Sequence, residues 1–152
     1  MHTLGRRPPP PLLAWFGTKH VPDVVLALEA AGGEVFVVGG AVRDWVMGRA
    51  PGDVDLLVRA LSPEQVRTTL ATFGTVALVG ERFGVLTCKM TATGRTYEVA
   101  LPRTDYSFAT GGYRDVTAQV DIHLPLSSDM QRRDFTMNAL AYRLTTNELF
   151  DF

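Results

Sequence analysis

The chain has 152 residues, 46% of them hydrophobic and 20% charged, which predicts one compact domain and excludes a disordered chain. Its net charge of −1 excludes a strongly basic protein, so any binding of nucleic acid must depend on local arginines or on a further segment. Cys88 is the single cysteine, which excludes an intrachain disulfide and a cysteine-based zinc site and favours a cytoplasmic location.

The first twenty residues differ in composition from the rest. Four consecutive prolines separate Arg6-Arg7 from Leu12-Leu13 and interrupt the pattern of a signal peptide. No apolar run approaches the roughly 18–20 residues needed to cross a bilayer. We therefore expect a flexible, polyproline-like arm over residues 1–20 and one domain over residues 21–152, with no membrane as partner.

The first half of this domain alternates helical and strand patterns. Glycine pairs at 32–33 and 39–40 interrupt the patterns, and Ser62 with Pro63 forms a helix-start signal. The expected elements are a helix over Pro22–Ala31, a strand over Glu34–Val38, a helix over Ala41–Met47, a strand over Val54–Val58 and a helix from Ser62 to about Phe73.

The second half is richer in strand patterns, with a hairpin turn at Thr93-Gly94. The expected elements are strands over Thr75–Val79, Val85–Met90 and Thr96–Leu101, a long irregular segment over Pro102–Pro125, a helical region from Ser127 or Ser128 to Tyr142, and a strand over Glu148–Phe150. Sequential and hairpin-linked strands mixed with helices predict an α+β fold, a mixed sheet with helices mainly on one face.

Two aspartates, Asp53 and Asp55, stand one residue apart at the start of an expected strand. Side chains at i and i+2 of a strand project from the same face, so the two carboxylates would lie together while Val54 points into the core. Mg²⁺ relieves their mutual repulsion and favours a few carboxylates combined with substrate phosphates. The alternative is a turn residue followed by an exposed side chain, and this pair alone does not decide between them.

A strand, a glycine turn and a helix follow one another from Val35 to Asp44. The start of a helix favours phosphate, and Gly40 has no Cβ to keep a triphosphate away from the backbone. Arg43 would add a charged fork for the same phosphates. The segment lacks both the G-x-G-x-x-G pattern and the lysine of a P-loop. A tight connection with a solvated arginine explains it equally well.

Together these residues resemble the class II tRNA nucleotidyltransferase (CCA-adding enzyme) and bacterial poly(A) polymerase family, a branch of the DNA polymerase beta-like superfamily. The likeness covers roughly residues 35–151, and two long, spaced motifs carry it. The first motif is Gly39-Gly40-Ala41-Val42-Arg43-Asp44, then Gly48-Arg49, then Asp53-Val54-Asp55-Leu56; the second is Arg132-Arg133-Asp134-Phe135-Thr136-Met137-Asn138-Ala139-Leu140-Ala141.

The resemblance implies a nucleotidyltransferase fold and a reaction in which an RNA 3′-hydroxyl, most simply that of tRNA, attacks the α-phosphate of CTP or ATP and releases pyrophosphate. It implies that Asp53 and Asp55 bind two Mg²⁺ ions. It also implies nucleotide binding by six residues, which are Gly39, Gly40, Arg43, Arg133, Asp134 and Asn138. Such a reaction needs positioning and neutralisation of charge more than covalent help from the protein.

Members of the superfamily often use a third carboxylate on a neighbouring strand. Glu98 is the best candidate, with Asp105 behind it, although a solvated strand face explains Glu98 nearly as well. Arg103 and Tyr106 begin the long irregular segment, where they either meet substrate or are exposed. Trp45 stands where the family usually has an aliphatic residue, and we expect it to pack against the sheet.

In this family, the choice between CTP and ATP and most tRNA contacts come from neck, body and tail segments after the head, which this sequence lacks. The chain is therefore expected to be a fragment or a head that needs a partner chain. Four alternatives remain: a poly(A) polymerase head, a transferase acting on a protein or small-molecule hydroxyl, a non-catalytic head that only binds nucleotide or scaffolds a partner, and an α+β domain whose motif matches are coincidental. The intact aspartates and arginine motifs favour an RNA-directed enzyme.

Overall fold

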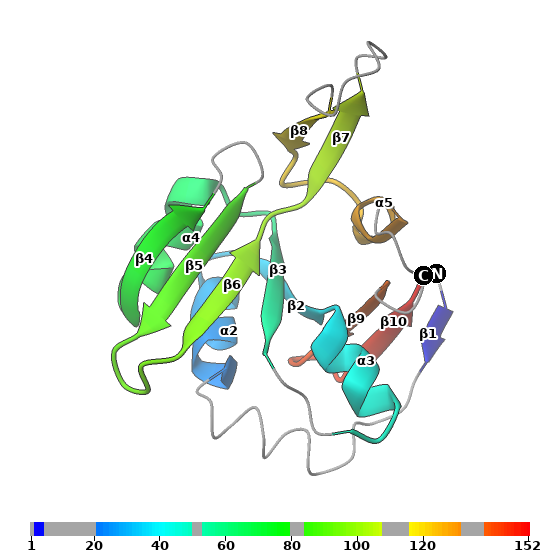
Figure 1. Ribbon diagram of the computed structural model, residues 1–152, viewed down its shortest axis with the longest axis horizontal. Coiled ribbons are helices and arrows are strands. Elements are labelled where there is room, and N and C mark those ends of the chain that lie inside the picture. The colour runs from blue at the N-terminus through cyan, green and yellow to red at the C-terminus, as the bar shows by residue number, and fades with distance from the viewer. Residues whose placement is uncertain (1, 5–20, 50–52, 80–83, 108–115, 132–138) are drawn as a thin grey trace.

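The computed structural model describes residues 2–4, 21–49, 53–79, 84–107, 116–131 and 139–152 (Figure 1). Four α-helices are described, namely α2 (Val21–Ala30), α3 (Gly40–Val46), α4 (Pro63–Leu70) and α5 (Leu126–Gln131). The strands are β1 (His2–Leu4), β2 (Glu34–Val38), β3 (Asp55–Arg59), β4 (Gly74–Val79), β5 (Val85–Met90), β6 (Thr96–Ala100), β7 (Arg103–Ser107), β8 (Val116–Val120), β9 (Leu140–Arg143) and β10 (Glu148–Asp151).

Eight of these strands form one mixed sheet in the order β1-β10-β9-β2-β3-β6-β5-β4. The pair β3–β6 is parallel and every other neighbouring pair is antiparallel. The parallel pair requires a crossover, which α4 and the β4–β5 hairpin provide between β3 and β6. Strands β7 and β8 form a separate antiparallel ribbon that extends away from the sheet (Figure 1).

The two faces of the sheet carry different cores. The larger core joins one face to α2, α3 and α4 through residues such as Leu28, Val42 and Leu70. The smaller core covers part of the other face with α5, whose Leu126 and Met130 pack with Leu57. Helices thus cover mainly one face, and the α+β prediction is confirmed.

Local signals explain where α4 begins. The Ser62 hydroxyl accepts a hydrogen bond from the Gln65 backbone N–H (3.2 Å), and the Gln65 side chain accepts one from the Ser62 N–H (2.9 Å). This capping box, with Pro63 in the first turn, satisfies N–H groups that a helix start leaves unpaired. The predicted cap at Ser62 is confirmed.

The structure differs from the sequence predictions in three places. Part of the supposedly irregular segment over residues 102–125 forms β7 and β8. The last helix begins at Leu126 rather than at a serine cap and is described as far as Gln131, residues 132–138 lie outside the described residues, and Leu140–Arg143 form strand β9 instead of helix. In the expected arm, His2–Leu4 pair with β10 as an edge strand, and residues 1 and 5–20 of the arm lie outside the described residues. In the described part of the chain, no helix is long and apolar enough to span a membrane.

Candidate active site where β2, β3 and β6 meet

The turn between β2 and α3 depends on the backbone of Gly39. Its φ of 76° and ψ of −138° lie in a region that residues with a side chain rarely adopt. Hydrogen bonds hold the turn, because the Gly39 N–H donates to the Leu140 carbonyl of β9 (3.3 Å) and the Arg43 N–H donates to the Gly39 carbonyl (3.1 Å). A Cβ at Gly39 would meet no atom within 4 Å. Conformation, not space, therefore requires glycine here.

The next residue, Gly40, lies beneath the Arg43 guanidinium. A Cβ on Gly40 would lie 3.3 Å from Arg43 Nη2. The Nε and Nη2 of Arg43 each donate to Asp44 Oδ1 at 3.2 Å, in an ion pair with both side chains partly exposed. The arginine therefore stays at the turn and presents a solvent-accessible positive charge beside a backbone without a Cβ.

The aspartates lie at the start of β3, which enters the sheet beside this turn. Val54 is 3% exposed and belongs to the helix-covered core, so the alternation of the chain directs Asp55 to the opposite face. Asp55 is the first residue of β3 and is partly buried. Asp53 lies in the bend before the strand and is exposed.

Strand register places a second carboxylate beside Asp55. Asp55 pairs with Val38 of β2 on one side and with Glu98 of β6 on the other, and Glu98 pairs in turn with Thr87 of β5. Paired residues share a face, and neighbouring strands lie about 4.8 Å apart. Asp55 and the exposed Glu98 thus project from adjacent positions on the face that α2 and α4 leave open.

The paired residues Val38, Asp55, Glu98 and Thr87 form a row across the sheet. Helix α5 bounds this row on one side. Leu57 follows Asp55 and Ala100 follows Glu98 on the same face, and both pack in the smaller core with Leu126 and Met130. The row therefore has a dry apolar boundary toward α5, whereas it is open to solvent toward β5 and β4.

Sequence reasoning missed Asp129, which is fully buried in α5. Its Oδ1 accepts a hydrogen bond from the Arg103 backbone N–H at 3.1 Å. The bond ties α5 to the beginning of β7, directly after the strand that carries Glu98. The available signal was its position between Leu126 and Met130, on the side of the helix that packs inward.

The other predicted residues fall into two groups. Trp45 packs against Tyr142, with ring centroids 5.7 Å apart, so its predicted structural role is confirmed. Arg103 is partly buried at the base of β7. Asp105 and Tyr106 belong to the backbone of β7, but their side chains lie outside the described part. Three predicted nucleotide-binding residues, Arg133, Asp134 and Asn138, lie outside the described residues.

The donor set fits magnesium better than a metal held by protein alone. Over the described ranges, no group of three or more histidine, cysteine, aspartate or glutamate side chains could hold a metal ion. Asp55 and Glu98 nevertheless offer hard oxygen donors on one face, with Asp53 just before them. Mg²⁺ takes one or two carboxylates and completes its shell with water and substrate phosphates, so these residues suit it.

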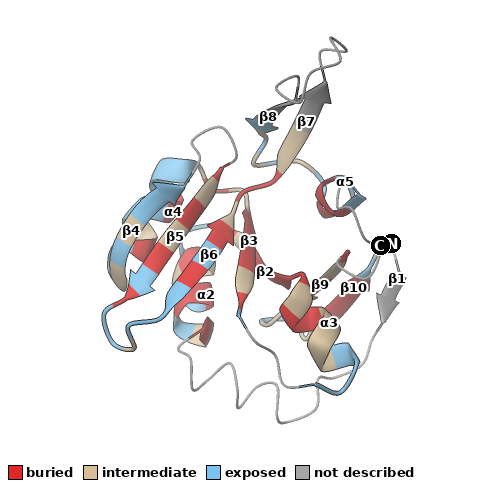
Figure 2. Cartoon of the chain, in the orientation of Figure 1, coloured by how far each residue is buried: buried red, intermediate tan, exposed pale blue. Residues whose placement is uncertain are grey.

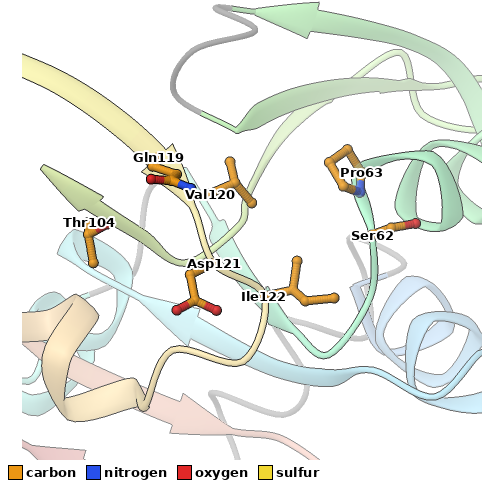
Figure 3. Close-up of a pocket in the computed structure, with 7 residues that line it drawn as sticks. All are labelled: Ser62, Pro63, Thr104, Gln119, Val120, Asp121 and Ile122. Atoms are coloured by element: carbon orange, nitrogen blue, oxygen red, sulfur yellow. The ribbon is translucent and has the colours of Figure 1, made fainter.

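A cavity of about 510 Å³ lies elsewhere, near the end of β3 opposite Asp55 (Figure 3). None of the predicted site residues lines it. Its lining residues come from the start of α4, from the ribbon and from the two residues after β8: Ser62, Pro63, Thr104, Gln119, Val120, Asp121 and Ile122. We therefore assign the candidate site to the row on the sheet and not to this cavity.

Comparison with known proteins identifies the family of the chain. Residues 35–152 match the model of the Poly A polymerase head domain. The chain belongs to this family. Among curated relatives, it is 40% identical over 120 residues to the CCA-adding enzyme of Geobacillus kaustophilus, and 36% identical over 125 residues to that of Bacillus cereus. The matches cover 78% and 81% of this chain but 27% and 29% of those proteins.

Solved structures show the same fold. The crystal structure of the Bacillus stearothermophilus CCA-adding enzyme in complex with CTP is similar, with 34% identity and a TM-score of 0.65. The match covers 90% of this chain and 29% of that one. A CCA-adding enzyme in apo form II, at 22% identity and a TM-score of 0.71, supports the fold alone. The predicted family and nucleotidyltransferase fold are confirmed, and the chain spans less than a third of the length of the curated relatives it matches.

Proposed function

We propose that the chain is the catalytic head of a template-independent RNA nucleotidyltransferase that adds CMP and AMP, from CTP and ATP, to the 3′-hydroxyl of tRNA. The observation that carries this proposal is the register Val38–Asp55–Glu98, which puts two carboxylates next to the Gly39-Gly40 turn. Family membership and the CTP complex of a relative support nucleotide transfer as the reaction. A cytoplasmic location remains a prediction.

The predicted site residues have two roles in this proposal: some bind the phosphates of the nucleotide, and others hold the metal ions at the reacting centre. Gly39 and Gly40 let the triphosphate approach the backbone, and Arg43 neutralises part of its charge. Asp53 and Asp55, with Glu98 as third carboxylate, hold two Mg²⁺ ions, which when bound lower the barrier by stabilising charge on the attacking and leaving oxygens. Arg133, Asp134 and Asn138 complete the nucleotide site in this proposal.

The proposed reaction is a substitution at the α-phosphorus. The RNA 3′-oxygen forms a bond to the α-phosphorus, and the bond from that phosphorus to the oxygen bridging to the β-phosphate breaks. Pyrophosphate leaves with the electron pair, and the proton of the hydroxyl passes to solvent. Asp55 and Glu98 act by position and charge, because this class of transfer needs little covalent help from the enzyme.

Incorporation of labelled CTP and ATP into tRNA that lacks its 3′-terminal CCA tests the proposal. We expect slow, magnesium-dependent addition by the wild-type chain and none by Asp55→Asn, which preserves shape and removes charge. Addition of AMP alone, to any RNA, would favour a poly(A) polymerase head. Label transferred to protein with RNA inert, or equal addition by Asp55→Asn, would contradict the proposal.

A further inference from the structure

One half of the sheet face that carries Glu98 is left uncovered by the described chain. Alternation along β4, β5 and β6 sends every second side chain away from the helix-covered core. We call these residues the open face; they are Thr75, Ala77, Val79, Val85, Thr87, Lys89, Thr96 and Glu98. All are exposed or partly exposed (Figure 2), so this face is accessible to a ligand.

The geometry of the proposed reaction indicates from which side of Asp55 the RNA hydroxyl arrives. In a substitution at phosphorus, the attacking and leaving oxygens lie roughly in line on opposite sides of the reacting atom. The phosphate-binding turn at Gly39-Gly40 follows β2, on one side of Asp55, so pyrophosphate leaves toward β2. The attacking hydroxyl must then arrive from the other side of Asp55, where Glu98 and the open face lie.

Lys89 is the single cation of the open face. It pairs with Thr96, two residues along the strands from the pair Thr87–Glu98 and on the same face. Two strand spacings, about 10 Å, separate its strand from that of Asp55. Its side chain is exposed and forms no ion pair or hydrogen bond with any residue in the described ranges. A positive charge is therefore available beside two carboxylates that would otherwise repel RNA.

We infer that the 3′-terminal strand of the RNA lies across the open face and that Lys89 contacts a phosphate of its backbone. The inference rests on the proposed function, because the in-line argument needs the nucleotide at the glycine turn. Lys89 lies only two strands away from Asp55, so the phosphate that it contacts belongs to the nucleotides next to the 3′ end. Phosphate contacts position RNA without reading its sequence, so Lys89 serves every step of addition.

The test separates RNA binding from nucleotide binding. For the wild-type chain, Lys89→Gln and Lys89→Arg, the affinity for tRNA lacking CCA is measured over a series of salt concentrations, and the affinity for Mg·CTP is measured by calorimetry. Arg67→Gln is the matched control, since Arg67 is an exposed cation on α4, across the sheet from the open face. Thermal unfolding of each variant checks that the fold is preserved.

We expect Lys89→Gln to weaken RNA binding about fivefold, the upper range for one exposed charge contact. The slope of log affinity against log salt should fall by about 0.7, the value for one single-strand phosphate. Lys89→Arg should restore both, and affinity for Mg·CTP should not change in any variant. Wild-type RNA affinity and slope in Lys89→Gln, or the same loss in Arg67→Gln, would overturn the inference.

Failure of the proposed function has a different signature. If the wild-type chain binds no Mg·CTP, the nucleotide site itself is wrong. If it binds Mg·CTP and Lys89→Gln loses that affinity instead of RNA affinity, the lysine faces the nucleotide and the RNA lies elsewhere. Each of these results also overturns the path across the open face.

Discussion

The two glycines of the β2–α3 turn should respond in opposite ways to the same substitution. In Gly39→Ala the added Cβ meets no atom within 4 Å, but the residue must keep a φ of 76° and a ψ of −138°. The cost is therefore backbone strain alone, about 1–3 kcal/mol. In Gly40→Ala the backbone φ is not positive, and the Cβ meets only the Arg43 guanidinium, with Nη2 at 3.3 Å and Cζ at 3.8 Å, at the end of a flexible side chain.

Gly40 is also the first residue of α3, where alanine favours helix by up to about 1 kcal/mol. Urea unfolding should thus show Gly39→Ala destabilised and Gly40→Ala unchanged or slightly more stable. Calorimetry should show the reverse for function, with Gly40→Ala binding Mg·CTP at least tenfold more weakly, about 1.4 kcal/mol, because its methyl group occupies the approach of the triphosphate. Wild-type stability of Gly39→Ala, or undiminished nucleotide binding by Gly40→Ala, would refute this division of roles.

Two further predictions concern the sheet. Gly74→Ala would place a Cβ against the backbone carbonyl of Lys89, so we expect β4 to detach from β5 and the midpoint of urea unfolding to fall by more than in Gly94→Ala, where a Cβ meets nothing within 4 Å. Burial raises the pKa of Tyr142 to about 12, above the value of about 10 for an unfolded chain. The contribution of this shift to the free energy of unfolding is therefore complete below pH 10 and is lost as the pH rises toward 12. Stability measured from pH 9 to 12 should decline less in Tyr142→Phe, and an equal decline in both proteins would contradict this assignment.

Short runs with clear local boundaries could be predicted from the sequence. Both faces of β2 are buried, but its β-branched and aromatic run between two glycine pairs indicated a strand, and the capping residues of α4 indicated where that helix begins. In β9, Ala141 faces one core and Tyr142 the other, so the apolar run has no alternation and resembles a buried helix. The first strand of the ribbon, Arg103–Ser107, is largely polar, and β1 depends on a partner at the far end of the chain.

The sequence named candidate residues for the site, but it did not predict their arrangement. The spacing of Asp53 and Asp55 suggested two carboxylates on one strand, whereas β3 begins at Asp55 and leaves Asp53 in the preceding bend. Glu98 stands beside Asp55 only because the crossover through α4, β4 and β5 returns β6 parallel to β3. Local spacing carries no information about this register, which depends on packing between distant segments.

The proposed role of Asp55 and Glu98 in binding the magnesium–nucleotide complex is tested most directly by calorimetry. Mg·CTP and Mg·ATP are titrated into the wild-type chain, Asp55→Asn and Glu98→Gln. We predict saturable heat for the wild type that disappears with EDTA, and at least a tenfold loss of affinity in Asp55→Asn and a smaller loss in Glu98→Gln, with circular dichroism unchanged. Equal affinity in all three proteins, or binding that persists without magnesium, would contradict the account.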